Sequence, residues 1–401
     1  MRICIVGGGV IGLFSAYYLI QSGHEVVILD RNQFDQGASY GNAGMICPSH
    51  FTPLAAPGVI RQSLKWMFKD TSPFYLKPRW DLHFIRWGWE FFKHANAAHV
   101  QNSIGPLSAL LHWSKTLYSE LAGNDLHFGL YPKGIIMVCN SGHGFSEEIQ
   151  MAQKAEKLGM NIRVLELKDL EALNPKTRIR AKGGIHYLDD MHLVPQELMK
   201  ALTTYLSNQV EWHPNMEVLN FNKNGRFIRS ISTSGGDIAA DVFIIAAGAW
   251  SGTLARQAGG QLNLEGGKGY NITVEQARPQ LQTPMILVEG RVAITPMGSR
   301  LRLGGTMELA GLNDRILPGR VEGILKSIEE YLPDYTAQQM QTIHPWFGFR
   351  PLSPTGLPLI CRLDPMDNVY INTGHGMLGL SLAPASGHLM NQLIHAHRHN
   401  A

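Results

Sequence analysis

The sequence has few cysteines and no long hydrophobic run, and both absences narrow what the protein can be. Cysteine occurs four times in 401 residues, at Cys4, Cys47, Cys139 and Cys361, and no two of them form a Cys-x-x-Cys pair. We therefore expect reduced thiols rather than a disulfide framework, and no metal site. No uninterrupted apolar stretch reaches the ~18 residues that a membrane-spanning helix needs, so we expect no transmembrane segment.

An excess of charge of one sign is also missing. Charged residues make up 17% of the chain, and the formal net charge is +3. A nucleic-acid-binding domain usually concentrates a much stronger positive charge on one face, so we expect no nucleic-acid partner. Low-complexity segments and repeats of fixed period are absent too. A globular chain with 44% hydrophobic residues remains, long enough for more than one domain.

The N-terminus combines apolar residues with glycines. Residues 3–6 are typical of a buried parallel strand, and the sequence GGGVIG follows at residues 7–12. We expect a helix from there to about residue 22, and a second strand over residues 25–29. Three consecutive glycines and no small-residue cleavage pattern argue against a signal peptide. We therefore expect a cytoplasmic protein.

Each part of this strand–turn–helix suits a dinucleotide. Gly7 allows the tight turn, Gly9 lets the backbone approach a pyrophosphate, and Gly12 lets the helix pack closely on the strand. The N–H groups and the dipole at the start of the helix favour phosphates. Asp30, at the end of the second strand, can accept hydrogen bonds from ribose hydroxyls. The predicted contacts of this Rossmann unit are Gly7, Gly9, Val10, Ile11, Gly12, Asp30 and Arg31.

Two later glycine turns favour FAD over NAD. A late apolar strand ends in a glycine turn within residues 240–250, and a strand at residues 369–372 leads into TGHGMLG and a helix rich in small residues. A simple NAD domain does not need this return to a nucleotide-type fold. A flavin does, because a helix N-terminus stabilises the negative charge that appears on the reduced ring. The predicted contacts here are Ala247, Gly248, Trp250, Gly374, His375, Gly376, Met377, Leu378 and Gly379.

Four segments carry a resemblance to a known family. They are VGGGVIGLFSAYYL, SYGNAGMICPSHFTPLAAPG, FRPLSPTGLPLI and GHGMLGLSLAPASGHLM, and their spacing fits nearly the full chain. Together they resemble the D-amino-acid oxidase and glycine oxidase superfamily, with the nearest likeness to bacterial D-amino-acid dehydrogenases. The resemblance implies bound FAD and a flavin that is crossed by the second segment. The contacts it implies there are Ser39, Asn42, Ala43, Gly44 and Met45.

The same resemblance implies the fold. We expect an α/β protein with a Rossmann-like FAD-binding domain and a second α+β domain, whose antiparallel sheet roofs the substrate pocket. Because the flavin motifs lie at both ends and in the middle of the chain, the FAD-binding domain must be discontinuous. We assign residues 1–80, 163–256 and 341–401 to it, and residues 81–162 and 257–340 to the second domain.

A substrate carboxylate needs a fixed cation in an apolar pocket, and the arginine fork can bind it through two hydrogen bonds. The resemblance assigns this role to Arg350. Four further polar residues are candidates for the substrate side, although each also has a purely structural interpretation: His50, Lys268, Tyr270 and His375. The resemblance implies that the neutral amine delivers its α-hydrogen as hydride to flavin N5, so we expect no general base.

Residues 61–93 are unusually rich in aromatic and basic side chains. Four of the eight tryptophans occur there. Tryptophan beside lysine and arginine suits a lipid headgroup interface, but the same aromatics would also suit the interior of the second domain. The residues concerned include Arg61, Lys65, Trp66, Phe68, Lys69, Lys77, Arg79, Trp80, Arg86, Trp87, Trp89 and Lys93.

The leading interpretation is an FAD-dependent D-amino-acid dehydrogenase that passes electrons to a quinone or carrier, peripheral on the inner face of the cell membrane if residues 61–93 face outward. The aromatic residues beside Arg350 favour D-proline or hydroxyproline as the substrate. An oxidase of glycine, sarcosine or a cyclic imino acid is the second interpretation. A non-catalytic FAD-binding subunit of a larger complex is the third, and a plain NAD dehydrogenase is the weakest.

Overall fold

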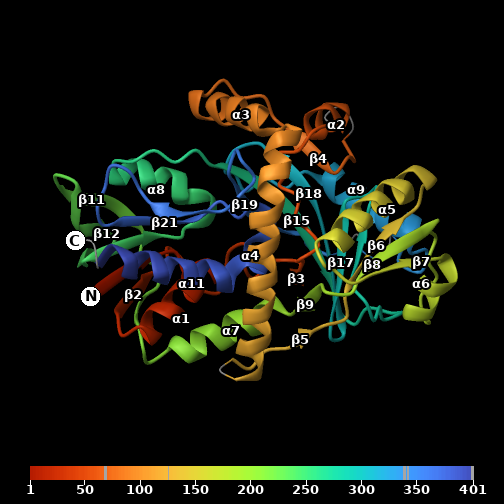
Figure 1. The fold of residues 1–401 in the computed structure, drawn as a ribbon, viewed down its shortest axis with the longest axis horizontal. Helices are drawn as coiled ribbons and strands as arrows, with labels where there is room; N and C mark the ends of the chain where they lie inside the picture. The colour runs from red at the N-terminus through yellow and green to blue at the C-terminus, as the bar shows by residue number, and fades with distance from the viewer. Residues whose placement is uncertain (67–69, 125, 337–339, 341–342, 399–401) are drawn as a thin grey trace.

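Two large sheets organise the chain, which a computed structural model describes over residues 1–66, 70–124, 126–336, 340 and 343–398. In Figure 1 one sheet and its helices lie to the left, and the other sheet lies to the right. A three-stranded sheet formed by β3, β9 and β5 lies between them. These strands are Met45–Ile46, Met191–Leu193 and Leu130–Tyr131.

The first sheet has six strands in the order β10-β2-β1-β14-β21-β20. Its first five strands are parallel, and only β20 is antiparallel to its neighbour. The central strands are apolar runs buried on both faces, as a parallel sheet requires. In sheet order the strands are Glu211–His213, Glu25–Leu29, Arg2–Val6, Val242–Ile245, Val369–Thr373 and Leu359–Arg362.

Helices cover one face of this sheet, and a smaller sheet covers the other. The core on the helical face contains residues of α1, α4, α7 and α11, and α1 packs directly on α11. These helices are Val10–Gln21, Ala97–Gly123, Pro195–Leu206 and Gly379–Arg398. The opposite face packs on α8 and on β11, β12 and β13. These elements are Ser251–Ala258, Val218–Asn224, Phe227–Thr233 and Gly236–Ala239.

The second sheet is mostly antiparallel and follows the order β19-β15-β18-β17-β16-β6-β8-β7, with β4 paired to β18. Helices α5, α6 and α9 pack on it (Figure 1). The strands, in sheet order, are Trp346–Leu352, Glu265–Val274, Arg300–Leu309, Val292–Met297, Met285–Leu287, Ile135–Cys139, Gly183–Tyr187 and Ile162–Leu165, with β4 at Phe74–Leu76. The helices are Gly142–Lys157, Leu167–Leu173 and Pro318–Tyr331.

The predicted fold class is confirmed, but several predicted domain boundaries disagree with the strand pairing. β4, β8, β19 and residues 163–165 of β7 fall within the predicted FAD-binding ranges, yet these four strands belong to the second sheet. Conversely, α4 was assigned to the second domain, but it packs on α11, and the Tyr118 hydroxyl donates to the Leu380 carbonyl at 2.7 Å. Short apolar strands look alike in sequence whichever sheet they join, so their pattern alone does not determine the domain boundaries.

The aromatic and basic stretch forms an arm that contains α2 (Val59–Trp66) and α3 (Leu82–His94), at the top of Figure 1. Some of its aromatic side chains are buried, as in a domain interior, and others are exposed, as a lipid headgroup interface would require. Trp87 is only 4% exposed, and its indole N–H donates to the Leu352 carbonyl at 2.9 Å. Trp80 and Trp89 are 97% and 59% exposed. Phe68 and Lys69 lie outside the described residues, and no helix in the described ranges has the length and hydrophobicity to cross a bilayer.

Candidate functional site

One cavity of about 1730 Å³ brings most of the predicted site residues together. It extends from Gly9 and Asp30, in the first sheet's turns, to Arg350 on the second sheet. Four predicted residues do not line it, namely Gly12, Gly44, Gly374 and Lys268. Gly12 and Gly44 instead allow close packing of the backbone behind the cavity.

The N-terminal glycines have distinct structural reasons. Gly7 has a φ of 116°, and a Cβ there would approach the Ala246 carbonyl oxygen to 2.5 Å. A Cβ at Gly12 would lie 1.9 Å from the Gly7 oxygen, so this glycine permits close helix–strand packing. At Gly9 a Cβ would meet only the Ser39 hydroxyl, at 3.3 Å. Gly9 therefore keeps space open on the cavity side, as the approach of a pyrophosphate requires.

Asp30 and Arg31 follow β2 at the same end of the cavity. The two carboxylate oxygens of Asp30 accept hydrogen bonds from the backbone N–H groups of Gly8 and Asn32, at 2.8 and 2.9 Å. These two bonds fix the orientation of the Asp30 side chain at this end of the cavity. The Arg31 guanidinium stacks 3.9 Å from the centre of the Trp250 ring. Arg31 and Trp250, which were predicted as cofactor contacts from two turns far apart in the chain, therefore lie side by side.

The loop at residues 39–45 is held by contacts with β9 and with the second sheet. Asn42 Oδ1 accepts from the Gly44 N–H at 2.8 Å, and Gly44 has a φ of 75° with no room for a Cβ beside the Leu193 carbonyl. Arg302 Nη1, on β18, donates to the carbonyls of Tyr40 and Asn42 at 3.0 and 2.9 Å. Arg302 is not among the predicted site residues, because nothing in its local motif indicates that the chain folds back onto this loop.

The C-terminal glycine turn supplies an uncharged histidine. His375 is buried, and its Nε2 lies 2.9 Å from the Ser386 hydroxyl. Burial lowers the pKa of His375 to about 3, so the ring is neutral. Thr373 Oγ1 donates to the Gly248 carbonyl at 3.1 Å, which ties this turn to the turn after β14. The three turns thus converge on one cavity, and the open Cβ position of Gly9 and the fixed Asp30 carboxylate fit FAD.

Arg350 places a positive charge at the other end of the cavity. Its Nη1 donates to the Thr306 carbonyl at 2.9 Å, and none of the ion pairs of the described residues includes it. Burial lowers the pKa of Arg350 to about 10, which still leaves it charged at neutral pH. A Cβ at Gly269 would lie 2.1 Å from Nη1, so the absence of a side chain there makes room for the guanidinium.

Lys268 and Tyr270 belong to a buried network beside this site. Lys268 is 0% exposed, and its Nζ contacts Glu308 Oε1 at 3.1 Å and Asn313 Oδ1 at 2.7 Å. This pairing places Lys268 away from the cavity and does not support a substrate contact. The Tyr270 hydroxyl donates to Glu308, while the residue also lines the cavity. Tyr270 can therefore wall the pocket without offering a free hydroxyl.

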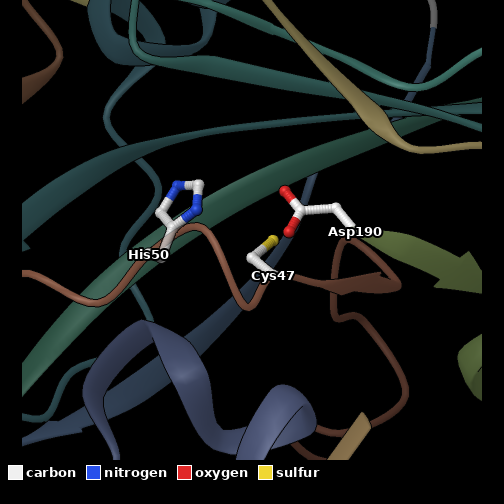
Figure 2. A group of neighbouring side chains, drawn as sticks. All are labelled: Cys47, His50 and Asp190. Atoms are coloured by element: carbon white, nitrogen blue, oxygen red, sulfur yellow. The ribbon is translucent and has the colours of Figure 1, made fainter. Parts of the chain in front are cut away.

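Figure 2 shows a cluster that the sequence analysis did not predict, formed by Cys47, His50 and Asp190. Their candidate ligand atoms all lie within 4.8 Å of one another, a spacing that could suit a metal ion. However, both Asp190 oxygens accept hydrogen bonds from Ser49, from its N–H at 3.0 Å and its hydroxyl at 2.6 Å. We interpret the cluster as a hydrogen-bonded network. Asp190 is far from Ser49 in the chain, so only the fold reveals it.

Comparisons with known proteins agree with this geometry. A D-amino acid dehydrogenase of Vibrio vulnificus is 29% identical over 98% of this chain and 96% of its own. One of Neisseria meningitidis is also 29% identical, over 98% and 96% of the two chains. Among solved structures, glycine oxidase from Geobacillus kaustophilus superposes with a TM-score of 0.78 at 23% identity, covering 98% of this chain and 95% of that one. The likeness to glycine oxidase, at 23% identity, supports the fold alone.

The DAO family, described as FAD dependent oxidoreductase, matches residues 2–393. This match spans both sheets and every turn that lines the cavity. FAD is therefore the cofactor of this protein, which belongs to the DAO family of FAD-dependent oxidoreductases.

Proposed function

We propose that this protein oxidises the carbon–nitrogen bond of a small D-amino acid. The observation that carries the proposal is Arg350, a guanidinium without an acidic partner among the described residues, in the cavity that the cofactor-binding turns also line. A buried cation of this kind is stabilised by a carboxylate, which every amino acid brings. The curated relatives named D-amino acid dehydrogenase support the D series.

The proposed roles follow from the position of each residue. Arg350 binds the substrate carboxylate, and the aromatic residues Trp346, Phe347 and Tyr270 wall the cavity around it. A flat apolar wall suits a cyclic substrate such as D-proline or hydroxyproline. When bound, FAD would supply the hydride acceptor for the α-carbon. The neutral His375 sits in the flavin-side turn and supplies a dipole without adding charge.

The arm supports an electron acceptor at a lipid surface, and we propose a quinone on the inner face of the cell membrane. Trp80, Trp89 and Phe92 are exposed large apolar residues, and Lys93 Nζ lies 5.1 Å from the Trp89 ring. Phe84, Trp87 and Phe91, on the same helix, line the cavity. The arm therefore connects a surface suited to lipid headgroups with the flavin site.

The test is anaerobic mixing of the purified yellow protein with a panel of D- and L-amino acids, scored by loss of flavin absorbance. D-amino acids should bleach the flavin, and their L-enantiomers should not. Peroxide formation in air shows how well oxygen accepts the electrons. The rate at which a water-soluble quinone is reduced tests the proposed quinone acceptor. A flavin that no amino acid bleaches would contradict the proposed function.

A further inference from the structure

A chain of hydrogen bonds connects the cavity to a buried carboxyl group. Asp190 is only 1% exposed, and its Oδ2 accepts from the Ser49 hydroxyl at 2.6 Å. The Ser49 oxygen in turn lies 3.1 Å from His50 Nδ1. In Figure 2 the His50 ring turns one nitrogen toward Asp190 and the other away from the cluster. His50 lines the same cavity as Arg350, and the other two residues lie behind it.

The direction of these bonds fixes the proton on His50. The Ser49 hydroxyl has one hydrogen, and the ionised Asp190 can only accept, so Ser49 donates to Asp190. Ser49 must then accept from His50, which places the ring proton on Nδ1 and leaves a lone pair on Nε2. The hydrogen bonds of the described residues give Nε2 no partner, and it is not among their buried unpartnered atoms. Nε2 therefore faces the open cavity.

Although the resemblance led us to expect no general base, we propose that His50, Ser49 and Asp190 form a proton relay that deprotonates the α-ammonium group of the bound substrate. The relay rests on the proposed function, since it needs an amino acid held by Arg350. One N–H bond of the ammonium breaks as Nε2 takes the proton, Nδ1 passes its proton to the Ser49 oxygen, and Ser49 passes its own to Asp190 Oδ2. The products are a neutral amine and a neutral carboxyl group, and no electrons are transferred.

The electrostatic surroundings suit the two ends of the relay. Burial raises the pKa of Asp190 to about 7 despite the hydrogen bonds from Ser49, with the charges of Lys115 and Asp189 nearby. Burial and the charge of Arg291 lower the pKa of His50 to about 4, so His50 passes the proton on rather than holding it. Burial also raises the pKa of the Cys47 thiol, which stays protonated and takes no part.

The test is the pH dependence of flavin reduction in the holoenzyme, measured anaerobically by stopped flow with D-alanine and D-proline. In the wild type the rate should rise with pH around the titration of Asp190, at nearly the same pH for both substrates. In Asp190→Asn the rise should move to higher pH and differ between the primary and the secondary amine. Near pH 7 the variant should be slower by roughly a hundredfold or more, since positioned acid–base groups contribute about 10²–10⁴-fold, and it should approach the wild type at high pH.

Three variants separate the relay from a structural role. Asp189→Asn is the matched control, because Asp189 bonds to Lys115 and Asn161 and does not contact Ser49. Ser49→Ala interrupts the relay with Asp190 intact and should shift the pH profile, while Ser49→Thr keeps the hydroxyl and should restore it. A uniform loss of rate at every pH in Asp190→Asn and Ser49→Ala would overturn the relay. A wild-type flavin that no D-amino acid reduces would overturn the proposed function instead.

Discussion

Arg350 and Thr306 are joined by a hydrogen bond in which the guanidinium Nη1 donates to the Thr306 carbonyl at 2.9 Å. Thr306 has a φ of 68°, which is rare and strained for a β-branched residue. The pairing of β15 with β18 shifts register at this point, between Lys268 and Tyr270. Such a bulge re-aims backbone groups, and here it turns a carbonyl toward Arg350, which fixes the orientation of the guanidinium.

Replacing Arg350 with Met should raise KM for the amino acid at least tenfold while flavin binding survives. Charged hydrogen bonds to a carboxylate are worth roughly 1.5–3 kcal/mol each, which sets this lower limit. Steady-state kinetics and the flavin absorbance of the purified variant are the measurements. Arg350→Lys keeps the positive charge but not the two-pronged guanidinium, and its KM should lie between those of the wild type and Arg350→Met. Wild-type kinetics in Arg350→Met would exclude Arg350 as the carboxylate ligand.

Gly269→Ala should mimic part of this loss without touching Arg350 itself. The added Cβ would lie 2.1 Å from Arg350 Nη1 and must displace the guanidinium. We expect a raised KM for the amino acid and a normal flavin spectrum. Gly88→Ala is a suitable control, because its Cβ would meet nothing within 4 Å. An unchanged KM in Gly269→Ala would mean that the arginine binds substrate equally well from another position.

The sequence predicted the cofactor site better than the substrate site, for a physical reason. The residues of the glycine turns are neighbours in the chain, and their strand–turn–helix pattern is itself the structure that holds phosphates. Arg302, Ser49 and Asp190 act through partners on other strands, so no local pattern reveals them. Lys268 illustrates the converse, because its motif placed it near the site but the fold paired it with Glu308.

Replacing Gly9 with Val should abolish flavin retention while the apoprotein stays folded. In the structure the new Cβ would approach only the Ser39 hydroxyl, at 3.3 Å, so the fold has room for it. The same side chain would occupy the space that a pyrophosphate needs. Absorbance near the flavin band measures retention, and circular dichroism measures folding. Full flavin content in a folded Gly9→Val protein would contradict the assignment of the N-terminal turn.

Asp190 should make the wild type less stable as the pH rises from about 4 to about 7. Burial raises its pKa from 3.8 to about 7 in the folded protein, so the folded state holds a proton that the unfolded state has already lost. The difference corresponds to roughly 4 kcal/mol. Asp190→Asn cannot titrate, so the unfolding free energy of the wild type should fall relative to this variant across that range, as urea denaturation at several pH values would show. If the unfolding free energies of the two proteins depend on pH in parallel, the pKa of Asp190 is the same in the folded and the unfolded state.

The exposed part of the arm should bind anionic vesicles through two separable contributions. Cations near an anionic surface contribute about 1 kcal/mol each, and salt screens this attraction over roughly 8–10 Å. The apolar contribution of Trp80 and Trp89 is insensitive to salt, since burial of apolar surface drives it. Co-sedimentation with vesicles should therefore decrease with salt without vanishing.

Paired variants assign each contribution to its residues. Replacing Trp80 and Trp89 together with Ser should remove most of the salt-resistant binding, while replacing Lys65 and Lys93 with Gln should weaken only the salt-sensitive part. Trp87 is the matched control, because its ring is buried and its indole N–H bonds to the Leu352 carbonyl. Trp87→Phe should leave vesicle binding unchanged even if it lowers stability. If the wild type ignores anionic vesicles at low salt, the arm does not dock on lipid, and a soluble electron acceptor becomes the better proposal.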